Sequence, residues 1–376
     1  MKRVLFAERR LPHYRVSLLE SVREKLGARG VAFDFIHGDP SPAELVRQDE
    51  GQLLWALRMR QTRYALGDRL VWQPFDVDGY DLVIVGQENR LLYNHWLCRP
   101  WRRFDLAFFG HGMNFAARHT NTLRERFKRF TTRQADWWFA YTALSKTIVE
   151  QVGFAPQRIT VVNNATDTST LRAQLASVSN AELEALRSGR HLTPGKTGLF
   201  LGSLYADKGL ELLLDAAAIV HAADPQFSLV IVGDGPARDV VANAAATMPG
   251  VHWLGALRGR DKALAMAASD FMLMPGAVGL SIVDGFAGGL PLLCTQSPGH
   301  GPEIAYLQPG QNGALTAPTS AAFAAAISQL LQAPDLLGHW RENARVDGLR
   351  LSVEAMAERF AGGIEDALSA SQRRPG

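Results

Sequence analysis

Asp284 stands alone as a charged residue in the segment 274–294, MPGAVGLSIVDGFAGGLPLLC, which is otherwise small and apolar. Gly276 and Gly279 predict a turn after an apolar strand, and the pattern predicts a helix that begins near Leu280. The unpaired N–H groups and the dipole at a helix start favour an anion, most often a phosphate. Asp284 lies about one turn further on, where a carboxylate could bind the two adjacent hydroxyl groups of a ribose. The alternative is that Asp284 only complements the helix dipole, and this segment alone does not decide between the two.

A second segment, GSLYADKG at residues 202–209, adds a cation. Gly202 would let the backbone approach a ligand, and Lys208 precedes a predicted helix, where its ammonium could neutralise a diphosphate. A single lysine is more often a solvated surface charge. Because both segments follow strands of one predicted domain, at the same end of its sheet, together they favour a nucleotide site.

Two other glycine-rich segments do not fit phosphate-binding motifs. GRHLTPGKTG has five residues between Gly189 and Gly195, where a P-loop has four, and it precedes a strand instead of following one. GDGPAR contains Gly233 and Gly235, but Arg238 occupies the position of the third glycine of a dinucleotide-binding fingerprint. We therefore expect neither a P-loop NTPase nor an NAD-binding protein.

The elements that must position these residues alternate between strand and helix. In the first half, RVLFAE, VAFDFIHG, YDLVIVGQEN, FDLAFFGHGMN and DWWFAYTALS are apolar runs that become polar or glycine-rich only at their ends. This pattern is typical of parallel strands covered on both faces by helices. The second half repeats the alternation, from GLFLGSL through FSLVIVGDG to DFMLMPG. The sequence predicts an α/β fold with doubly wound parallel sheets.

The length of 376 residues exceeds what one hydrophobic core usually holds. We expect a first Rossmann-like domain over 1–170 and a second over 197–355. The polar stretch 171–196 would connect them, and a last helix over 356–376 would pack back on the first domain. The two domains would face each other across a cleft, with ligands at the carboxyl ends of the strands.

Composition excludes several classes of protein. Apolar residues make up 47% of the chain and charged residues 20%, which is typical of a globular protein. Residues 1–170 hold 25 Lys and Arg against 18 Asp and Glu, so the first half suits an anionic surface or ligand, unless the excess serves solubility alone. Cys98 and Cys294 form neither a disulfide framework nor a zinc motif, which favours a reducing cytosol. No apolar run approaches the roughly 18 residues of a membrane span, and we expect no signal peptide.

The ordered motifs resemble the retaining glycosyltransferases of family 4, the glycosyl transferases group 1. GSLYADKGLELLLDAA is similar to the G-x-L-x-x-x-K-G segment of that family, and LVIVGDGP, VHWLGAL and PGAVGLSIVDGFAGGLPLL follow in the family's order. NNATDTSTL, at 163–171, resembles the N-G-x-D segment that closes the first domain, with Ala165 in place of glycine. LPHYRV and FGHGMN resemble members that act in bacterial surface-polysaccharide biosynthesis. The resemblance implies a GT-B fold, with the acceptor held by the first domain and a nucleotide sugar by the second.

The resemblance also implies roles for single residues. Lys208 would neutralise the donor diphosphate, and His111 would contact the transferred sugar, so these two are the catalytic candidates. Asp284 would bind the ribose in the place of a glutamate. The donor-binding candidates are Gly202, Ser203, Lys208, Gly233, Gly279, Leu280, Ser281 and Asp284, and Glu303 would orient the loop before it. The candidates on the acceptor side are His13, Tyr14, Arg15, Glu88 and Asn114.

Two positions depart from the family pattern. Ser203 stands where many members have an arginine beside the diphosphate. Gly276 stands where the first glutamate of the E-x7-E pair would contact the donor sugar. The nucleotide site is therefore better supported than the identity of the sugar.

The mechanism implied is transfer with retention of the anomeric configuration. Lys208 and the amides at the helix start would stabilise the departing nucleoside diphosphate. No Asp-x-Asp pair stands at a strand end to hold Mg²⁺, so we expect neither a metal nor a cofactor. No residue stands out as a covalent nucleophile.

A basic segment, RHTNTLRERFKRFTTR at 118–133, bears on location. It intersperses arginines and a lysine with Leu123, Phe127 and Phe130, a mixture that suits the surface of an anionic membrane. The alternative is a solvated helix with a stripe that faces the core. Nucleic acid is not expected, because the segment has no aromatic stacking platform. We expect a cytoplasmic protein, with peripheral contact with the inner face of the plasma membrane if this segment binds lipid.

The main prediction is thus a hexosyltransferase that uses a nucleotide sugar and a glycan or polyprenyl-linked oligosaccharide acceptor in polysaccharide biosynthesis. One alternative is a non-catalytic nucleotide-sugar-binding scaffold on the same fold, which Ser203 and Gly276 would explain. The other is a sugar-nucleotide epimerase, for which the sequence offers no clear acidic pair to remove a proton.

Overall fold

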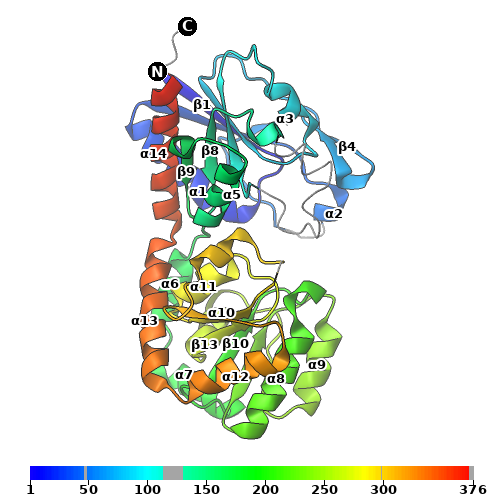
Figure 1. Cartoon of the computed structure of the whole chain (residues 1–376), viewed down its shortest axis with the longest axis vertical. Helices are drawn as coiled ribbons and strands as arrows, with labels where there is room; N and C mark the ends of the chain where they lie inside the picture. Colours follow the sequence, from blue (N-terminus) through cyan, green and yellow to red (C-terminus); the bar gives the residue numbers. More distant parts are fainter. Residues whose placement is uncertain (46–48, 113–129, 298, 372–376) are drawn as a thin grey trace. The chain divides into compact units, whose positions relative to one another are not determined.

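The computed structural model describes residues 1–45, 49–112, 130–297 and 299–371 (Figure 1). The chain forms two compact units. Unit 1 comprises Met1–Ala165 and the chain from Val353 onward, and unit 2 comprises Thr166–Ser352. Asn114 and most of the basic segment 118–133 lie outside the described residues. Among the described residues, no helix has both the length and the hydropathy of a bilayer-spanning segment.

Unit 1 is built on a parallel sheet with the strand order β3-β2-β1-β6-β7-β8-β9. The strands are β1 (Lys2–Glu8), β2 (Val31–His37), β3 (Leu57–Arg58), β6 (Leu82–Gly86), β7 (Asp105–Gly110), β8 (Trp137–Ala140) and β9 (Ile159–Val161). A separate antiparallel hairpin pairs β4 (Arg63–Ala65) with β5 (Leu70–Trp72). The helices are α1 (Val16–Ala28), α2 (Pro42–Leu45), α3 (Leu92–Leu97), α5 (Ala143–Gln151) and α14 (Val353–Ser371).

The last helix, α14, is part of the core of unit 1. The ring of Phe360 packs against Phe6 of β1 and Phe139 of β8, with ring centroids 5.6 and 4.7 Å away. Arg29, at the end of α1, pairs with Glu365 of α14 at 2.7 Å. The central strands have helices on both faces, which explains why their sequences are continuous apolar runs.

Unit 2 contains a second parallel sheet, with the order β12-β11-β10-β13-β14-β15. Its strands are β10 (Thr197–Leu201), β11 (Ser228–Val232), β12 (Val251–Trp253), β13 (Phe271–Met274), β14 (Leu292–Thr295) and β15 (Gly313–Thr316). The helices are α6 (Ser169–Ala176), α7 (Asn180–Arg190), α8 (Leu210–Ala223), α9 (Arg238–Thr247), α10 (Gly259–Ala267), α11 (Ser281–Ala287), α12 (Ser320–Leu331) and α13 (Pro334–Arg350). The predicted α/β fold with doubly wound parallel sheets is confirmed.

Both sheets reverse their strand order at one point, between β1 and β6 in unit 1 and between β10 and β13 in unit 2. In open α/β sheets, ligands bind beyond the carboxyl ends of the strands at this switch point. The loops that follow β1 and β6, and those that follow β10 and β13, are therefore the places to examine for function.

The stretch 171–196 is not a connection between domains, as its polar composition had suggested. It forms most of α6 and all of α7, which pack on α10 within unit 2. Ser179 and Glu182 form a capping box at the start of α7, and Glu182 pairs with Arg260 of α10 at 2.7 Å. Its polar composition reflects helices at the surface of unit 2. The units divide instead after Ala165 and after Ser352.

Candidate functional site

Two loops of unit 2 that the sequence singled out are joined at the carboxyl edge of its sheet. The Nζ of Lys208, in the turn after β10, donates to the carbonyl of Ala277, in the loop after β13, at 2.7 Å. The amide of Gly276 donates to the carbonyl of Lys208 at 3.1 Å, and the amide of Ala277 donates to the carbonyl of Asp207 at 2.9 Å. We call residues 275–279 the 275–279 loop. Main-chain hydrogen bonds therefore hold Lys208 against this loop.

Gly276 lies where no side chain fits. A Cβ added to this residue would lie 2.2 Å from the carbonyl carbon of Lys208 and 2.3 Å from the carbonyl oxygen of Asp207. Gly276 does not have a positive φ, so the requirement for glycine comes from this close approach and not from backbone conformation. The sequence presented Gly276 as a glutamate lost from a sugar contact. The structure shows a glycine needed to hold the lysine-bearing turn.

The ammonium of Lys208 is partly withdrawn from water. Burial lowers its pKa below the ordinary 10.5, and the neighbouring Asp207 opposes this effect. A buried ammonium is stabilised by a nearby anion. Lys208 is therefore suited to bind an anionic group placed at this edge of the sheet.

His300 contacts and supports the 275–279 loop. The sequence analysis did not identify this residue. Its Nδ1 accepts the amide of Val278 at 3.2 Å, and its Nε2 lies 2.7 Å from the carbonyl of Thr295, to which it must donate. These partners assign the neutral ring with its proton on Nε2. Burial lowers the pKa of His300, and the charge of Lys208 lowers it further. The only signal in the sequence was a histidine between two glycines, GHG.

Glu303 lies beside the same loop. It is buried in the short 3-10 helix Pro302–Tyr306. A Cβ on Gly301 would come within 2.6 Å of its Oε2, and the amide of Gly301 donates to the carbonyl of Val278 at 2.7 Å. Glu303 thus lies next to the backbone that contacts the 275–279 loop.

Asp284 is engaged in an ion pair. Its Oδ2 lies 2.7 Å from the Nζ of Lys262 in α10, and each side chain is about a quarter exposed. The sequence predicted a ribose ligand or a dipole partner, and nothing in it marks Lys262, which lies 22 residues earlier. A ribose bound by Asp284 would have to share this carboxylate with Lys262.

The residues at the start of α11 differ in what surrounds them. Gly279 has open space around the position that a Cβ would take. Leu280 is the N-cap residue of α11, and no side chain caps this helix end. The hydroxyl of Ser281 donates to the sulfur of Met274 at 3.2 Å. The hydroxyl of Ser281 therefore already has an intramolecular partner, so a ligand at this helix start would contact the amide of Ser281.

Gly202 and Gly233 bring two loops of unit 2 together. The amide of Gly202 donates to the carbonyl of Val232 at 3.0 Å, and a Cβ on Gly233 would lie 1.8 Å from the carbonyl oxygen of Gly202. The sequence suggested that Gly202 admits a ligand. The structure shows that Gly233 is needed because another backbone segment passes it. Ser203, between these loops and the Lys208 turn, is exposed.

Unit 1 has a cavity of about 450 Å³ at the carboxyl edge of its own sheet. Its charged and aromatic lining residues are Glu8, Arg9, Arg10, Tyr14, Arg15, Glu44, Asp68, Glu88, Arg90, Phe109, His111 and Tyr141. It gathers four predicted residues, Tyr14, Arg15, Glu88 and His111. His13 does not line the cavity, because its backbone amide and Nδ1 face the carbonyl of Asp49, at 2.8 and 3.3 Å.

Arg15 lies at the floor of this cavity and is only 3% exposed. Its guanidinium donates to the Oδ1 of Asn164 at 3.1 Å and to the hydroxyl of Tyr141 at 2.9 Å. It also lies 4.9 Å from the centre of the Phe109 ring. The ring of Tyr141 in turn contacts that of His111, with centroids 4.3 Å apart. Arg15 is thus a buried support for the residues that face the cavity.

The sequence analysis missed Glu8, Arg9 and Arg10 at the end of β1, although AERR shows charges that directly follow an apolar run. Burial raises the pKa of Glu8, Arg15 lowers it, and Glu88 raises it. Arg9 forms two hydrogen bonds with Glu44, and Arg10 forms two with Asp49 at 2.7 and 2.9 Å.

Each cation of the cavity wall has a carboxylate partner: Arg90 pairs with Glu88 at 2.7 Å, and Glu8 lies 3.8 Å from Arg15. The wall is therefore polar with balanced charge, and tyrosine and histidine rings lie beside it. Such a wall suits a ligand rich in hydroxyl groups.

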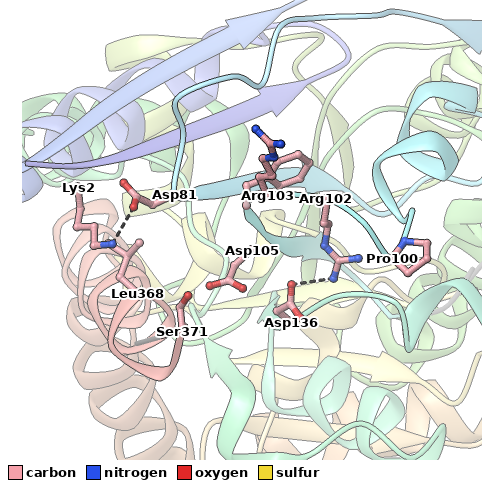
Figure 2. Close-up of a pocket in the computed structure, with 10 residues that line it drawn as sticks. Lys2, Asp81, Pro100, Arg102, Arg103, Asp105, Asp136, Leu368 and Ser371 are labelled. Atoms are coloured by element: carbon pink, nitrogen blue, oxygen red, sulfur yellow. Dashed lines mark hydrogen bonds and ion pairs between the residues drawn. The ribbon is translucent and has the colours of Figure 1, made fainter. Parts of the chain in front are cut away.

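A second cavity of unit 1, of about 320 Å³, lies at the opposite edge of the sheet (Figure 2). Figure 2 shows Lys2 paired with Asp81 and Arg102 paired with Asp136, at 2.7 and 2.8 Å. Asp81 also accepts the amide of Arg3, and Asp136 accepts the amide of Leu106. These carboxylates hold the starts of the strands together, so this cavity is a weaker candidate for a site. Over the described residues, no group of three or more His, Cys, Asp or Glu is placed to hold a metal ion.

Comparisons with known proteins find similar glycosyltransferases. Residues 195–333 match the family model described as Glycosyl transferases group 1. The chain is 24% identical over 200 residues to the sulfoquinovosyl transferase SQD2 of Arabidopsis thaliana, covering 50% of this chain and 36% of that protein. It is 31% identical over 106 residues to the phosphatidyl-myo-inositol mannosyltransferase of Mycobacterium leprae, covering 27% of this chain and 28% of that protein. The matched regions thus span only about a third of the length of these curated relatives.

The solved structures that resemble this chain have the GT-B fold, as predicted. The crystal structure of Anabaena Alr3699/HepE in complex with UDP matches with a TM-score of 0.67 and 18% identity, covering 97% of this chain and 100% of that chain. At this identity the likeness is evidence for the fold alone.

Proposed function

We propose that this chain, whose residues 195–333 form a Glycosyl transferases group 1 domain, is a retaining, metal-independent glycosyltransferase. It moves a hexose-type sugar from a nucleotide sugar to a glycan or lipid-linked oligosaccharide in polysaccharide biosynthesis. The observation that carries the proposal is the contact of Lys208 with the 275–279 loop at the carboxyl edge of unit 2. The matching crystal structures of Anabaena HepE, with UDP and with UDP-glucose, support a nucleotide-sugar donor.

The donor site would use Lys208 as its main cation. A diphosphate beside Lys208 would stabilise an ammonium that burial now disfavours, and this stabilisation grows as the sugar leaves and negative charge develops on the diphosphate. The amides of Gly279, Leu280 and Ser281 would add hydrogen-bond donors. Asp284 would bind the ribose hydroxyls while it stays near Lys262.

Recognition of the donor sugar would depend on backbone and bound water near Gly276, because a side chain is excluded there. With glycine at position 276, no carboxylate is present there to bind sugar hydroxyls. We therefore expect weaker discrimination among hexoses at that side of the sugar than a bidentate carboxylate would give.

The acceptor would bind in the carboxyl-edge cavity of unit 1. Its balanced charges and its Tyr14 and Tyr141 rings suit a neutral sugar unit. His111, which lies against Tyr141 at the end of β7, would contact the transferred sugar. Arg15 would act through Tyr141 as a positioning residue, since its guanidinium is buried beneath that ring.

A thermal-shift screen against UDP, GDP, ADP and their sugars tests the donor site, because a ligand that binds the folded state raises the melting temperature. We expect one nucleoside diphosphate to raise it, and Lys208→Met to abolish that rise. The control is Lys146→Met. Lys146 lies in α5 of unit 1 and pairs with Glu150. A Lys208→Met variant that responds like the wild type would refute the proposed site.

Transfer itself is tested with a radiolabelled donor and membrane extract. The scaffold alternative, which the excluded side chain at Gly276 favours, predicts a thermal shift while no donor is consumed. An epimerase would interconvert donors with no acceptor present. Labelled product that requires the donor, the extract and the added chain, and that Lys208→Ala abolishes, would exclude both alternatives.

A further inference from the structure

Three tryptophans of unit 1 expose their rings to solvent. Trp72 is 38% exposed, Trp96 45% and Trp101 76%. Leu92, in the same helix as Trp96, is also exposed. A cluster of large exposed apolar side chains on a soluble protein is typical of an interaction site.

Ring contacts join two of these tryptophans into one surface. Trp72 of β5 packs edge-on against Tyr93 of α3, with centroids 5.6 Å apart, and Tyr93 stacks on Trp96 at 4.9 Å. The helix α3 contacts β5 directly. Trp101 follows five residues after Trp96. We name the tryptophan surface as Arg63, Trp72, Leu92, Trp96, Arg99, Trp101 and Arg103.

An arginine accompanies each of the three tryptophans. Arg63 is the cross-strand partner of Trp72 in the hairpin. The guanidinium of Arg99 lies 3.3 Å from the centre of the Trp96 ring. The exposed Arg103 follows Trp101.

The tryptophan surface contains three arginines and no acidic residue, and Arg103 also lines the amino-edge cavity together with Asp81, Asp105 and Asp136. From residue 91 to residue 104 the chain has three arginines and no aspartate or glutamate. Arg102 is already paired with Asp136, which leaves Arg99 and Arg103 from this segment together with Arg63. Asp76 and Asp78 lie close enough to Tyr93 to raise its pKa, so they offset part of this charge.

We propose that the tryptophan surface binds unit 1 to an anionic lipid bilayer. Indole rings favour the level of the lipid headgroups, where their apolar body leaves water and their N–H stays hydrated. Arginines beside them would reach the lipid phosphates, and each basic residue near an anionic surface strengthens binding. The tryptophan surface shares no residue with the basic segment 118–133, and its role does not require the transfer reaction.

The geometry disfavours two other occupants. At Trp96 a stacked glycan is disfavoured, because Tyr93 and Arg99 lie so close to the ring centre that they occupy its two faces. A second copy of the chain in a two-fold contact would bring the same arginines against each other. Like charges brought together in this way oppose association.

Flotation of the full chain with vesicles tests the proposal. We expect binding to vesicles of phosphatidylcholine and phosphatidylglycerol, and much weaker binding to phosphatidylcholine alone. Trp101→Ser and Arg103→Gln should each weaken binding about fivefold, the loss of roughly one interfacial anchor or charge. Because Trp101 is highly exposed, these variants should keep the wild-type melting temperature, and Trp101→Phe should retain most of the binding.

Matched controls come from α13 of unit 2. Leu349→Ser and Arg345→Gln replace side chains that are about half exposed, like those of the tryptophan surface, and should leave vesicle binding unchanged. Equal binding of the wild type to neutral and anionic vesicles, or no binding to either, would overturn the proposal.

Three further results would also contradict it. The first is a Trp101→Ser, Arg103→Gln double variant that floats like the wild type. The second is loss of binding only when Arg124, Lys128 and Arg129 of the basic segment are replaced by glutamine. The third is a wild-type dimer in light scattering that Trp101→Ser converts to a monomer while vesicle binding persists. Failure of nucleotide binding would leave vesicle binding unaffected, so the two proposals fail separately.

Discussion

Replacing Gly276 with alanine is the sharpest test of how the donor loop is built. The new Cβ would lie 2.2 Å from the carbonyl carbon of Lys208 and 2.3 Å from the carbonyl oxygen of Asp207. Both neighbours are backbone atoms, so no side-chain rotation relieves the clash. The turn before α8 and the 275–279 loop must therefore move apart.

The loss in free energy of unfolding can be worked out from the contacts that this separation breaks. Overpacking costs about 1–3 kcal/mol. The hydrogen bonds from the amides of Gly276 and Ala277 to the carbonyls of Lys208 and Asp207 contribute about 1 kcal/mol each. We expect Gly276→Ala to lower the free energy of unfolding of unit 2 by about 3–5 kcal/mol. Because Lys208 moves with the turn, any nucleotide-induced thermal shift should disappear as well.

Gly279→Ala is the matched control, three residues further along the same loop. A Cβ at Gly279 would meet no atom within 4 Å, and Gly279 has no positive φ. We expect Gly279→Ala to leave the free energy of unfolding unchanged or to raise it by up to about 1 kcal/mol, because alanine reduces the entropy of the unfolded chain.

Urea denaturation followed by far-UV circular dichroism compares the two variants, and hydrogen exchange of the β10 and β13 amides assigns the loss to unit 2. Equal stabilities of Gly276→Ala and Gly279→Ala would refute the close approach at Gly276.

Three other substitutions test buried ionisable groups. Lys208→Met removes an ammonium whose pKa burial lowers from 10.5, together with its hydrogen bond to the carbonyl of Ala277. The stability of the wild type relative to the variant should therefore increase as the pH rises toward 10.5. Glu8→Gln replaces a carboxyl whose pKa burial raises from 4.5, so the variant should be the more stable at neutral pH, and its advantage should shrink as the pH falls to 4.5. His300→Phe leaves the amide of Val278 without its partner and should cost about 1–3 kcal/mol. The pKa of His300 lies below 6.5, so the wild type should lose stability as the pH falls below 6.5, and this component should be missing in the variant. Melting curves across pH measure all three, and parallel curves for variant and wild type would contradict the assigned burial.

The fold could be predicted from the sequence. Strands such as RVLFAE and FDLAFFG are buried on both faces, so their apolar runs record their position directly. The same pattern placed Lys208 and the 275–279 loop at strand ends, and parallel strands present all those ends at one edge. The motifs therefore predict that the two segments belong together.

The partners of individual side chains depended on the tertiary structure. Lys262 of α10 pairs with Asp284 of α11, and His300 supports the 275–279 loop from the loop that follows β14. No local pattern marks such contacts, because they depend on how elements distant in sequence pack. The packing of α6 and α7 on α10 could not be predicted either, because both helices have mostly polar sequences.

Gly276 shows the division most clearly. The sequence determined that no carboxylate stands at this position. Only the tertiary structure revealed why glycine is needed, since the space for a Cβ is filled by the backbone of Asp207 and Lys208 from another loop. A sequence records which side chains are present, whereas the room around each of them is set by the packing of the whole unit.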